Sequence, residues 1–388
     1  MEKNFLTQQY LSDKKLKIKH NYLSEQFKDY EKIFSKIKKV IKFNDYTLGF
    51  EVEKFENNFK KIMNSKYCIA VGSGTDAIYL SLKMLNLKNN SEVITTPYTF
   101  YATINAIAQA GCIPKFVDAQ DDFNINPDLI EKSINKKTRA ILVVHWSGRI
   151  CDMRKIRKIA KKHNLFIIED ACHAALSKYN NIYAGNFGDL GCFSLHPLKN
   201  LNVWGDGGMI TTNNKNYAKK LRLLRNHGLK NRNEIEIFGV NSRLDTIQAV
   251  VANHLIKKLN KITKLRRRNA AYLDKCLKEI PYINFPKRDK NLKEVFHIYS
   301  VQAVKRDLLA KFLIKNNIDA KKHYPIPMHL QKPLKKLGYK KGDFPVSEKL
   351  AKTTLSLPVH EFLRKKDLNY MIKNIKFFYK NYSKNINS

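Results

Sequence analysis

Acidic residues are scarce in this 388-residue chain, which has 34 Asp and Glu residues against 72 Lys and Arg residues and a formal net charge of +38. Such a charge is common in proteins that bind nucleic acid or anionic membranes. The basic residues, however, are spread along the whole chain rather than gathered in one stripe or arm. We interpret the densest runs, 257–258 and 264–268, as solvated helix faces. We therefore expect no nucleic-acid partner, and a basic regulatory protein associated with nucleic acid stays open as an alternative.

The chain also lacks long apolar runs and paired cysteines. No apolar run approaches the roughly 20 residues that cross a bilayer, and neither end has the pattern of a secretory signal. The six cysteines form no Cys-x-x-Cys pair and no zinc-ligand spacing. We expect a cytoplasmic protein without a membrane partner or a bound metal, with reduced cysteines that mostly pack in the core.

The centre of the chain alternates short apolar segments with segments of helical periodicity. Strands are predicted at 67–71, 92–95, 113–117, 140–144, 165–168 and 190–194. Helices are predicted between several of them, at 77–85, 102–110 and 153–163. This alternation predicts an α/β fold with a mostly parallel sheet that helices cover on both faces. Ligands bind such sheets beyond the carboxyl ends of the strands.

Length and composition predict three parts. Residues 1–21 are polar and lysine-rich, and we expect them to form a loosely packed extension without a chemical role. Residues 22–260 are expected to form a large domain and residues 261–388 a smaller α/β domain. A long helical stretch, about 245–277, is predicted to connect the two.

Lys199 follows the predicted strand 190–194, and its neighbours Leu198, Leu201 and Trp204 are apolar. A lysine on an exposed face rarely has such neighbours. An amine must be neutral to attack an aldehyde, and a desolvated pocket favours the neutral form. The setting therefore predicts that Lys199 forms a Schiff base.

The segment 72–77 joins a predicted strand to a predicted helix and contains two glycines. Glycines let the backbone approach an anion, and the free N–H groups at a helix start can bind phosphate. Gly74, Thr75 and Asp76 are the candidates here, and Ser194 could add a hydroxyl group. An ordinary strand-to-helix turn uses the same residue types as caps, so the motif alone leaves both interpretations open.

Asp170 ends an apolar strand, and His173 follows three residues later. A carboxylate beside the ring nitrogen of pyridoxal phosphate (PLP) keeps that nitrogen protonated, although a strand-end carboxylate can also cap a helix. His173 would lie near the ring's phenolic oxygen or be structural, and Phe100 could stack on the ring or belong to the core. Amine, acid and phosphate turn together predict a PLP site.

These segments resemble the DegT/DnrJ/StrS family of PLP-dependent sugar aminotransferases, which has fold type I of the PLP enzymes. The resemblance extends from about residue 45 to residue 362. Matching segments include 45–49, 72–77, 97–103, 169–174, 193–200, 205–208, 225–228, 239–245, 328–331 and 355–360. It implies that Lys199 forms the Schiff base, that Asp170 pairs with the ring nitrogen and that His173 borders the ring oxygen.

The resemblance also implies a homodimer whose active sites lie between the subunits. In that arrangement Gly74, Thr75 and Ser194 hold the phosphate together with the partner subunit's Asn241. Arg243, Tyr324 and His329 occupy segments that lie near the substrate in relatives, which makes them substrate-binding candidates.

The implied reaction moves an amino group from an L-amino acid, with glutamate as the expected donor, to a keto or aldehyde sugar for amino-sugar and surface-polysaccharide synthesis. We expect a nucleotide-linked acceptor, with a free acidic ketosugar as the alternative. The segments 144–149 and 202–206 depart from the family pattern, which leaves the sugar unidentified. A related branch that replaces the lysine, often by histidine, consists of dehydratases, and Lys199 argues against it. An α/β scaffold without chemistry would leave Lys199 unexplained.

Overall fold

The computed structural model describes residues 16–20 and 22–384, and its largest element is a seven-stranded sheet of order β1-β9-β8-β5-β4-β2-β3. The strands are β1 (Tyr67–Val71), β2 (Glu92–Thr95), β3 (Ile113–Phe116), β4 (Thr138–Val144), β5 (Phe166–Asp170), β8 (Leu190–Ser194) and β9 (Gly208–Thr212). Neighbouring strands from β8 to β3 are parallel, and β9 is antiparallel to both β1 and β8. The predicted mostly parallel sheet is confirmed, and β9 is a strand that the sequence analysis missed.

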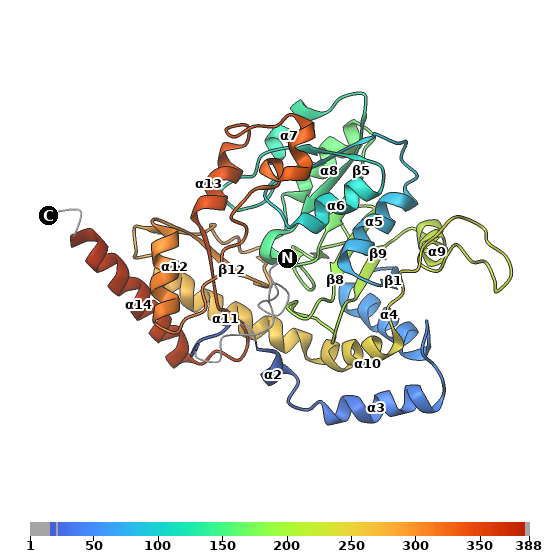
Figure 1. The fold of residues 1–388 in the computed structure, drawn as a ribbon, viewed down its shortest axis with the longest axis horizontal. Coiled ribbons are helices and arrows are strands. Elements are labelled where there is room, and N and C mark those ends of the chain that lie inside the picture. The colour runs from blue at the N-terminus through green and yellow to red at the C-terminus, as the bar shows by residue number, and fades with distance from the viewer. Residues whose placement is uncertain (1–15, 21, 385–388) are drawn as a thin grey trace.

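Helices cover both faces of this sheet (Figure 1). They are α4 (Phe50–Met63), α5 (Gly74–Met84), α6 (Tyr101–Gln109), α7 (Pro127–Ser133), α8 (Met153–Lys162), α9 (Lys215–Leu224) and α10 (Thr246–Leu255). In β1, Ile69 and Val71 pack with α5, α6 and α9, whereas Cys68 and Ala70 pack with α4, α8 and α10. Because successive side chains of a strand point to opposite faces, burial of both sets makes the strand apolar throughout.

A long helical connection leads to a second, smaller sheet. Helix α10 passes through a 3-10 turn, η2 (Ile256–Lys258), into α11 (Leu259–Leu277), which confirms the predicted helical stretch (Figure 1). The smaller antiparallel sheet contains β10 (Ile283–Asn284), β12 (Tyr299–Ala303) and β13 (Thr354–Leu357), and it packs with α11, α12 (Arg306–Lys315) and α14 (Lys365–Lys384). The domain boundaries at residues 21 and 260 stay a prediction.

Three short elements between these strands return to the large sheet. They are η3 (Met328–Leu330), η4 (Lys332–Leu337) and α13 (Pro345–Thr353). Leu350 packs with Tyr98 and Trp146, and Met328 packs with Phe116. Figure 1 shows α13 on the side of α7, away from α14. The segment before α13 therefore reaches the edge of the sheet where the candidate site lies.

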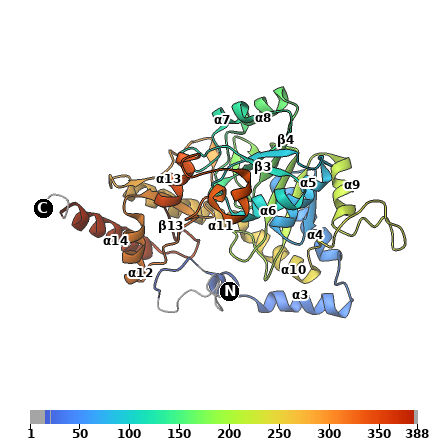
Figure 2. The ribbon, with the colours of Figure 1, turned by 45° about the horizontal axis from the view of Figure 1, so that its top comes forward.

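The N-terminal region packs closely where the structure describes it. Helices α2 (Leu23–Gln26) and α3 (Glu31–Lys42) precede α4, and Figures 1 and 2 both show α3 beside α10. The backbone N–H groups of Lys17 and Ile18 donate to Asn317 O at 2.9 and 3.0 Å, and Ile18 is 2% exposed. The expected loose packing is thus wrong for residues 16–20, because Ile18 joins the core of the smaller sheet. Residues 1–15 and 21 lie outside the described residues.

The charged run 264–268 lies on α11 and is only partly a solvated face. Lys264, Arg267 and Arg268 are exposed, but Arg266 is 2% exposed, and its Nε donates to Glu361 at 3.1 Å. The interpretation as a solvated face is therefore wrong for Arg266, whose side chain points into the core between α11 and residue 361. The residue types of a charged segment do not show which of them lie on the buried face of a helix and which lie on its exposed face.

All six cysteines are free thiols, as expected, and four of them are buried. Among residues 16–20 and 22–384, no helix combines the length and the apolar character needed to cross a bilayer.

A second three-stranded sheet contains β6 (Lys178–Tyr179), β7 (Ile182–Tyr183) and β11 (Leu292–Lys293). A 3-10 turn, η1 (Trp146–Gly148), follows β4.

Candidate active site

Lys199 lies in the loop that leaves the carboxyl end of β8. Buried Leu195, Leu201 and Val203 fix this loop in the core, and Val203 N donates to Leu195 O at 2.9 Å. Asn202 Nδ2 donates to the carbonyl oxygen of Lys199 at 2.8 Å. The loop has no regular secondary structure, so these contacts hold the backbone of Lys199 in place.

The side chain of Lys199 is half-buried, and its amine is unpaired within the described residues. Burial lowers the pKa of Lys199, and the negative charge of Asp170 opposes this lowering only in part. Within the described residues, no hydrogen bond or ion pair joins Lys199 Nζ to another group. A lysine of this kind has a larger neutral fraction than an exposed lysine, as an amine nucleophile requires.

Asp170 ends β5 and is 6% exposed. Its Oδ2 accepts a hydrogen bond from Thr103 Oγ1 at 2.8 Å, and its Oδ1 accepts one from the backbone N–H of Cys172 at 3.2 Å. Thr103 lies on α6 and is itself 2.8 Å from Thr99 Oγ1. A carboxylate held by two donors has a defined orientation toward the space beyond the strand.

Glu169, the residue before Asp170 in β5, fixes the end of this strand. Glu169 is fully buried and accepts hydrogen bonds from the backbone N–H groups of Gly185, Phe187 and Gly188 at 2.7 to 2.8 Å. His145 Nε2 lies 2.8 Å from the same carboxylate. A buried charge requires such satisfaction, and here it locks the end of β5.

The turn 72–77 is a helix N-terminus beside the Lys199 loop. Ser73 is the N-cap of α5, and its Oγ accepts from Asp76 N at 3.0 Å. A Cβ atom at Gly74 would lie 2.6 Å from Ser194 Cβ and 3.0 Å from Cys172 Sγ. Gly74 therefore allows the turn to contact the ends of β5 and β8. The N–H groups of the first helical turn point at this junction and suit an anion.

Asp76 faces the interior of the protein. Its Oδ2 accepts a hydrogen bond from Ser242 Oγ at 2.8 Å, and Ser242 Oγ in turn accepts from Gly72 N at 3.1 Å. These contacts tie the segment that carries Asn241 to the turn. Asp76 thus holds that segment in place, and the binding of a phosphate by Gly74, Thr75 and Ser194 stays a prediction.

His173 is a buried histidine whose ring packs against a second imidazole, that of His297. Its Nδ1 accepts from Ser147 N at 3.3 Å, which leaves the ring proton on Nε2. Its ring centroid is 4.4 Å from that of His297. Burial lowers the pKa of His173 and of His297 well below the usual range, and the nearby charge of Lys199 acts in the same direction. Both rings are therefore neutral near pH 7.

Two aromatic candidates lie at the mouth of the site. Phe100 is the residue before α6 and is 37% exposed, and its ring centroid is 5.6 Å from that of Tyr324. Tyr324 also contacts Trp146 edge to face at 5.4 Å. Burial raises the pKa of Tyr324, so its hydroxyl stays protonated. The Phe100 ring packs against Tyr101, with centroids 3.8 Å apart, and its stacking on the cofactor ring stays a prediction.

Three further candidates lie outside this arrangement. Asn241 is exposed, and Arg243 Nη1 donates to Asn226 Oδ1 at 3.1 Å. His329 is 1% exposed, its Nε2 lies 3.1 Å from Glu348 Oε1, and its ring packs against Phe344. These contacts make His329 part of the packing around α13. Asn241 is exposed, and Arg243 is half-buried.

Comparison with known proteins decides the family. The family model for the DegT/DnrJ/EryC1/StrS aminotransferase family matches residues 28–376. This chain belongs to that family. A "pleiotropic regulatory protein" of Geobacillus stearothermophilus is 39% identical over 93% of this chain and 98% of the relative. A dTDP-3-amino-3,6-dideoxy-alpha-D-galactopyranose transaminase of Aneurinibacillus thermoaerophilus is 36% identical over 84% of this chain and 90% of the relative.

Solved structures agree with the family assignment. The S. venezuelae DesV structure in complex with a ketimine intermediate has a TM-score of 0.90 and 32% identity, over 93% of this chain and 98% of that chain. The Bacillus subtilis NtdA structure with bound cofactor PMP has a TM-score of 0.85 and 28% identity, over 96% of this chain and 91% of that chain. The chain is a PLP-dependent sugar aminotransferase with the predicted fold.

The residues present fit PLP. The desolvated amine of Lys199, the buried carboxylate of Asp170 and the helix start at Gly74 converge at the carboxyl edge of the sheet. They match the aldehyde, the ring nitrogen and the phosphate of the cofactor in charge and in donor type. The contact of Gly74 with Ser194 and Cys172 brings the three segments together.

Sequence reasoning missed Thr103, Cys172 and His297 as members of the site. Thr103 lies within a segment that resembles the family, but its hydrogen bond with Asp170 spans 67 residues. His297 meets His173 across an even longer stretch of chain. Cys172 lies between Asp170 and His173, and its closeness to these two predicted site residues was the one signal in the sequence that indicated it.

Proposed function

We propose that this aminotransferase takes the amino group of L-glutamate and passes it to a keto or aldehyde carbon of a nucleotide-linked sugar. The observation that supports the proposal is the position of Lys199, whose unpaired amine interacts with the charge of Asp170 in the loop after β8, while the start of α5 at Gly74 contacts Ser194 at the end of the same strand. The formal charge of +38 supports an acidic acceptor such as a sugar diphosphate nucleotide, because a positive field attracts dianions.

The chain's own groups divide the work. The cofactor, when bound, supplies an aldehyde for the amino group and a ring that accepts negative charge. Lys199 Nζ would hold the cofactor and would take the proton from the substrate carbon that bears nitrogen. Asp170 would keep a proton on the ring nitrogen, and His173 would donate through Nε2–H to the phenolic oxygen of the ring. The N–H groups of Gly74 and Thr75 and the hydroxyl of Ser194 would bind the phosphate.

Replacement of Lys199 by alanine tests the site. We expect Lys199→Ala to fold, to lose turnover, and to carry no cofactor on residue 199 after borohydride reduction and peptide mass spectrometry. The variant Lys215→Ala, which replaces an exposed lysine, is the control and should keep wild-type turnover and the cofactor on Lys199. A folded Lys199→Ala protein with wild-type turnover would show that the assignment of the amine is wrong.

We further propose a homodimer in which Asn241 completes the site of the partner. Asn241 is exposed in the single chain, and the neighbouring residues Ile235 and Phe238 are 66% and 98% exposed. Figure 1 shows the loop after α9 projecting from the body of the chain. An exposed apolar loop of this kind supports contact with a second copy.

Mixing two inactive variants tests the shared site. If Lys199 and Asn241 act in one site from different subunits, mixed dimers of Lys199→Ala and Asn241→Ala chains contain one intact site. After unfolding and joint refolding, about a quarter of the wild-type activity should return, since about half of the dimers are mixed. Failure of mixing to restore activity, with mixed dimers detected by native mass spectrometry, would assign Asn241 to its own chain.

The acceptor is distinguished from a free acidic ketosugar by direct comparison. The ratio kcat/KM should be higher for a UDP- or dTDP-linked ketosugar than for a free keto uronic acid, and the preference should shrink as salt rises. A higher kcat/KM for the free sugar would favour the second acceptor.

We place the reaction in the cytoplasm because all six cysteines are free thiols.

A further inference from the structure

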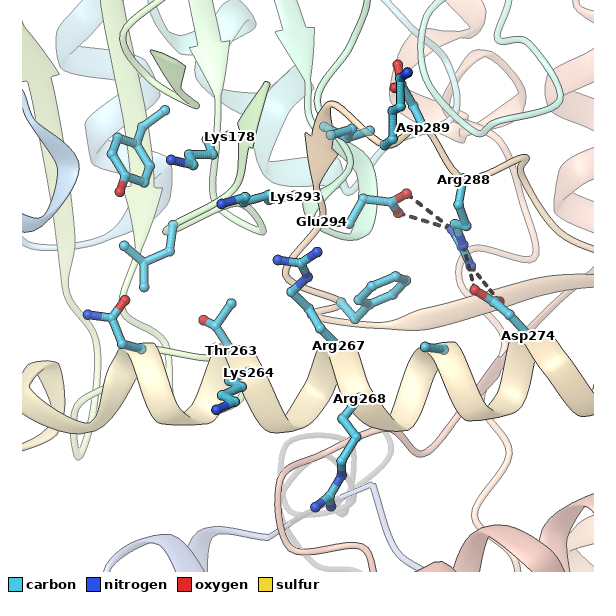
Figure 3. A pocket seen from close by; sticks show the side chains of 17 residues that line it. Lys178, Thr263, Lys264, Arg267, Arg268, Asp274, Arg288, Asp289, Lys293 and Glu294 are labelled. Atoms are coloured by element: carbon cyan, nitrogen blue, oxygen red, sulfur yellow. Dashed lines mark hydrogen bonds and ion pairs between the residues drawn. The ribbon is translucent and has the colours of Figure 1, made fainter. Parts of the chain in front are cut away.

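A basic cavity, separate from the residues of the PLP site, lies between α11, the β6–β7 hairpin and the segment 288–296 (Figure 3). Its volume is about 630 Å³, which lies within the range of small-molecule pockets. Its lining combines cationic side chains with the apolar residues Leu176, Leu292 and Phe296. No residue proposed above for catalysis or for PLP binding lines it.

The cations of this cavity are not neutralised by its acids. Arg288 occupies both Asp274, at 2.9 and 3.0 Å, and Glu294, at 3.1 Å. Arg149 binds Glu294 as well, at 2.6 Å. Figure 3 shows Arg288 between these two carboxylates. The buried acids are therefore satisfied by these two arginines, and Asp289 is the one other acid in the lining.

Three elements then contribute cations without an acidic partner. Arg267 of α11 points into the cavity, and Lys178 of β6 and Lys293 of β11 lie on the opposite wall (Figure 3). In the described part of the chain, none of the three forms an ion pair, and the Lys178 amine lies over the ring of Tyr183. Like charges brought together from separate elements repel, and a multivalent anion removes that cost.

Thr263 provides an independent observation. It lies on α11, lines the cavity, and its Oγ1 is buried without a hydrogen-bond partner in the described structure. Buried hydroxyl groups are normally satisfied, so Thr263 has an unused hydrogen-bond donor at the wall of the cavity. An unsatisfied donor beside unpaired cations favours a phosphate group.

We infer that this cavity binds a nucleoside diphosphate, independently of the substrate site. The cations Arg267, Lys178 and Lys293 contact the phosphates, Thr263 donates to one of them, and Leu292 and Phe296 pack against the nucleoside. The inference does not depend on the aminotransferase reaction, because it concerns equilibrium binding alone.

The wall that separates the cavity from the PLP site is a single segment. Lys293 and Phe296 line the cavity, whereas Val295 O accepts from Asn200 Nδ2 at 3.2 Å and the His297 ring packs on His173. Because Glu294 and Phe296 line the cavity while Val295 and His297 contact residues near the PLP site, this segment separates the two sites. A ligand in the cavity contacts the segment that supports His173.

Calorimetric titration of the PLP-loaded enzyme with UDP tests the inference. We expect UDP affinity to fall about tenfold in Arg267→Ala and further in Arg267→Ala/Lys293→Ala, since a charge-assisted contact to phosphate contributes on this scale. Lys261→Ala, an exposed lysine of α11 outside the lining, is the matched control and should bind UDP like the wild type. Turnover at saturating substrate should be unchanged in all of these variants.

Three results would overturn the inference. Equal UDP affinity in the wild type and the double variant would place UDP elsewhere. Inorganic pyrophosphate binding as tightly as UDP would exclude the nucleoside contact. A double variant that loses affinity for duplex DNA but not for UDP would assign the cations to a nucleic acid. Because binding is measured without turnover, none of these outcomes bears on the proposed reaction.

Discussion

Replacement of Thr103 by valine should slow catalysis without disturbing substrate binding. Thr103 Oγ1 donates to Asp170 Oδ2 at 2.8 Å, and both residues are buried. Valine has nearly the same shape but no hydroxyl group, so the carboxylate loses one of its two protein donors. A hydrogen bond to a charged group contributes about 1.5–3 kcal/mol.

The loss is expected in kcat rather than in KM. With Asp170 less well held, protonation of the ring nitrogen is weaker when negative charge develops, and about 1.5–3 kcal/mol corresponds to a roughly 10- to 160-fold decrease in kcat. Thr103 is fully buried, so KM for glutamate should change little. The assay is the rate at which glutamate converts the PLP form to the pyridoxamine form, followed by absorbance.

Two matched variants separate this effect from general damage. Thr103→Ser keeps the donor and should recover most of the rate. Thr99→Val removes a hydroxyl that reaches Asp170 only through Thr103, at 2.8 Å, and should cost less than Thr103→Val. If Thr103→Val bound PLP fully and reacted at the wild-type rate, the positioning role of Thr103 would be refuted.

Three other perturbations test the site and its support. Gly74→Ala should weaken PLP binding at least tenfold in a cofactor titration, because its Cβ would lie 2.6 Å from Ser194 Cβ, whereas Gly205→Ala, which meets only the flexible Gln248 side chain at 3.2 Å, should bind normally. Arg266→Met should lower the free energy of unfolding by about 3–5 kcal/mol by leaving buried Glu361 unpaired, and urea denaturation should show that Arg266→Met/Glu361→Gln is less destabilised than the sum of the single variants. Burial lowers the pKa of His360 to about 3, so between about pH 6.5 and pH 3 the unfolded chain binds a proton that the folded chain does not, and the free energy of unfolding should fall as pH drops from about 6.5. In thermal denaturation, His360→Gln should remove about 2 kcal/mol of that loss at pH 5. An unchanged dependence of stability on pH in this variant would contradict the prediction.

The regular elements near the site were predictable because their signals are local. The strands 67–71, 92–95 and 190–194 agree with β1, β2 and β8, since each is a short apolar run bounded by turn residues. Strand β9, Gly208–Thr212, was missed because it begins within the glycine-bearing stretch 205–208, although Ile210 and the two threonines favour a strand. Its pairing with β1 and β8 defines it as a strand.

The sequence by itself determined which residues can do the chemistry. Lys199 among apolar neighbours, Asp170 at a strand end and the glycine turn at 72–77 each carry their signal within a few residues. Only the tertiary structure decided which groups orient and surround them: the donor Thr103 on Asp170, the inward direction of Asp76, the packing role of His329 and the burial of Arg266. The same holds for the cavity of Arg267, Lys178 and Lys293. The physical reason is that contacts between residues distant along the chain depend on how whole elements pack, and local periodicity contains no record of that packing.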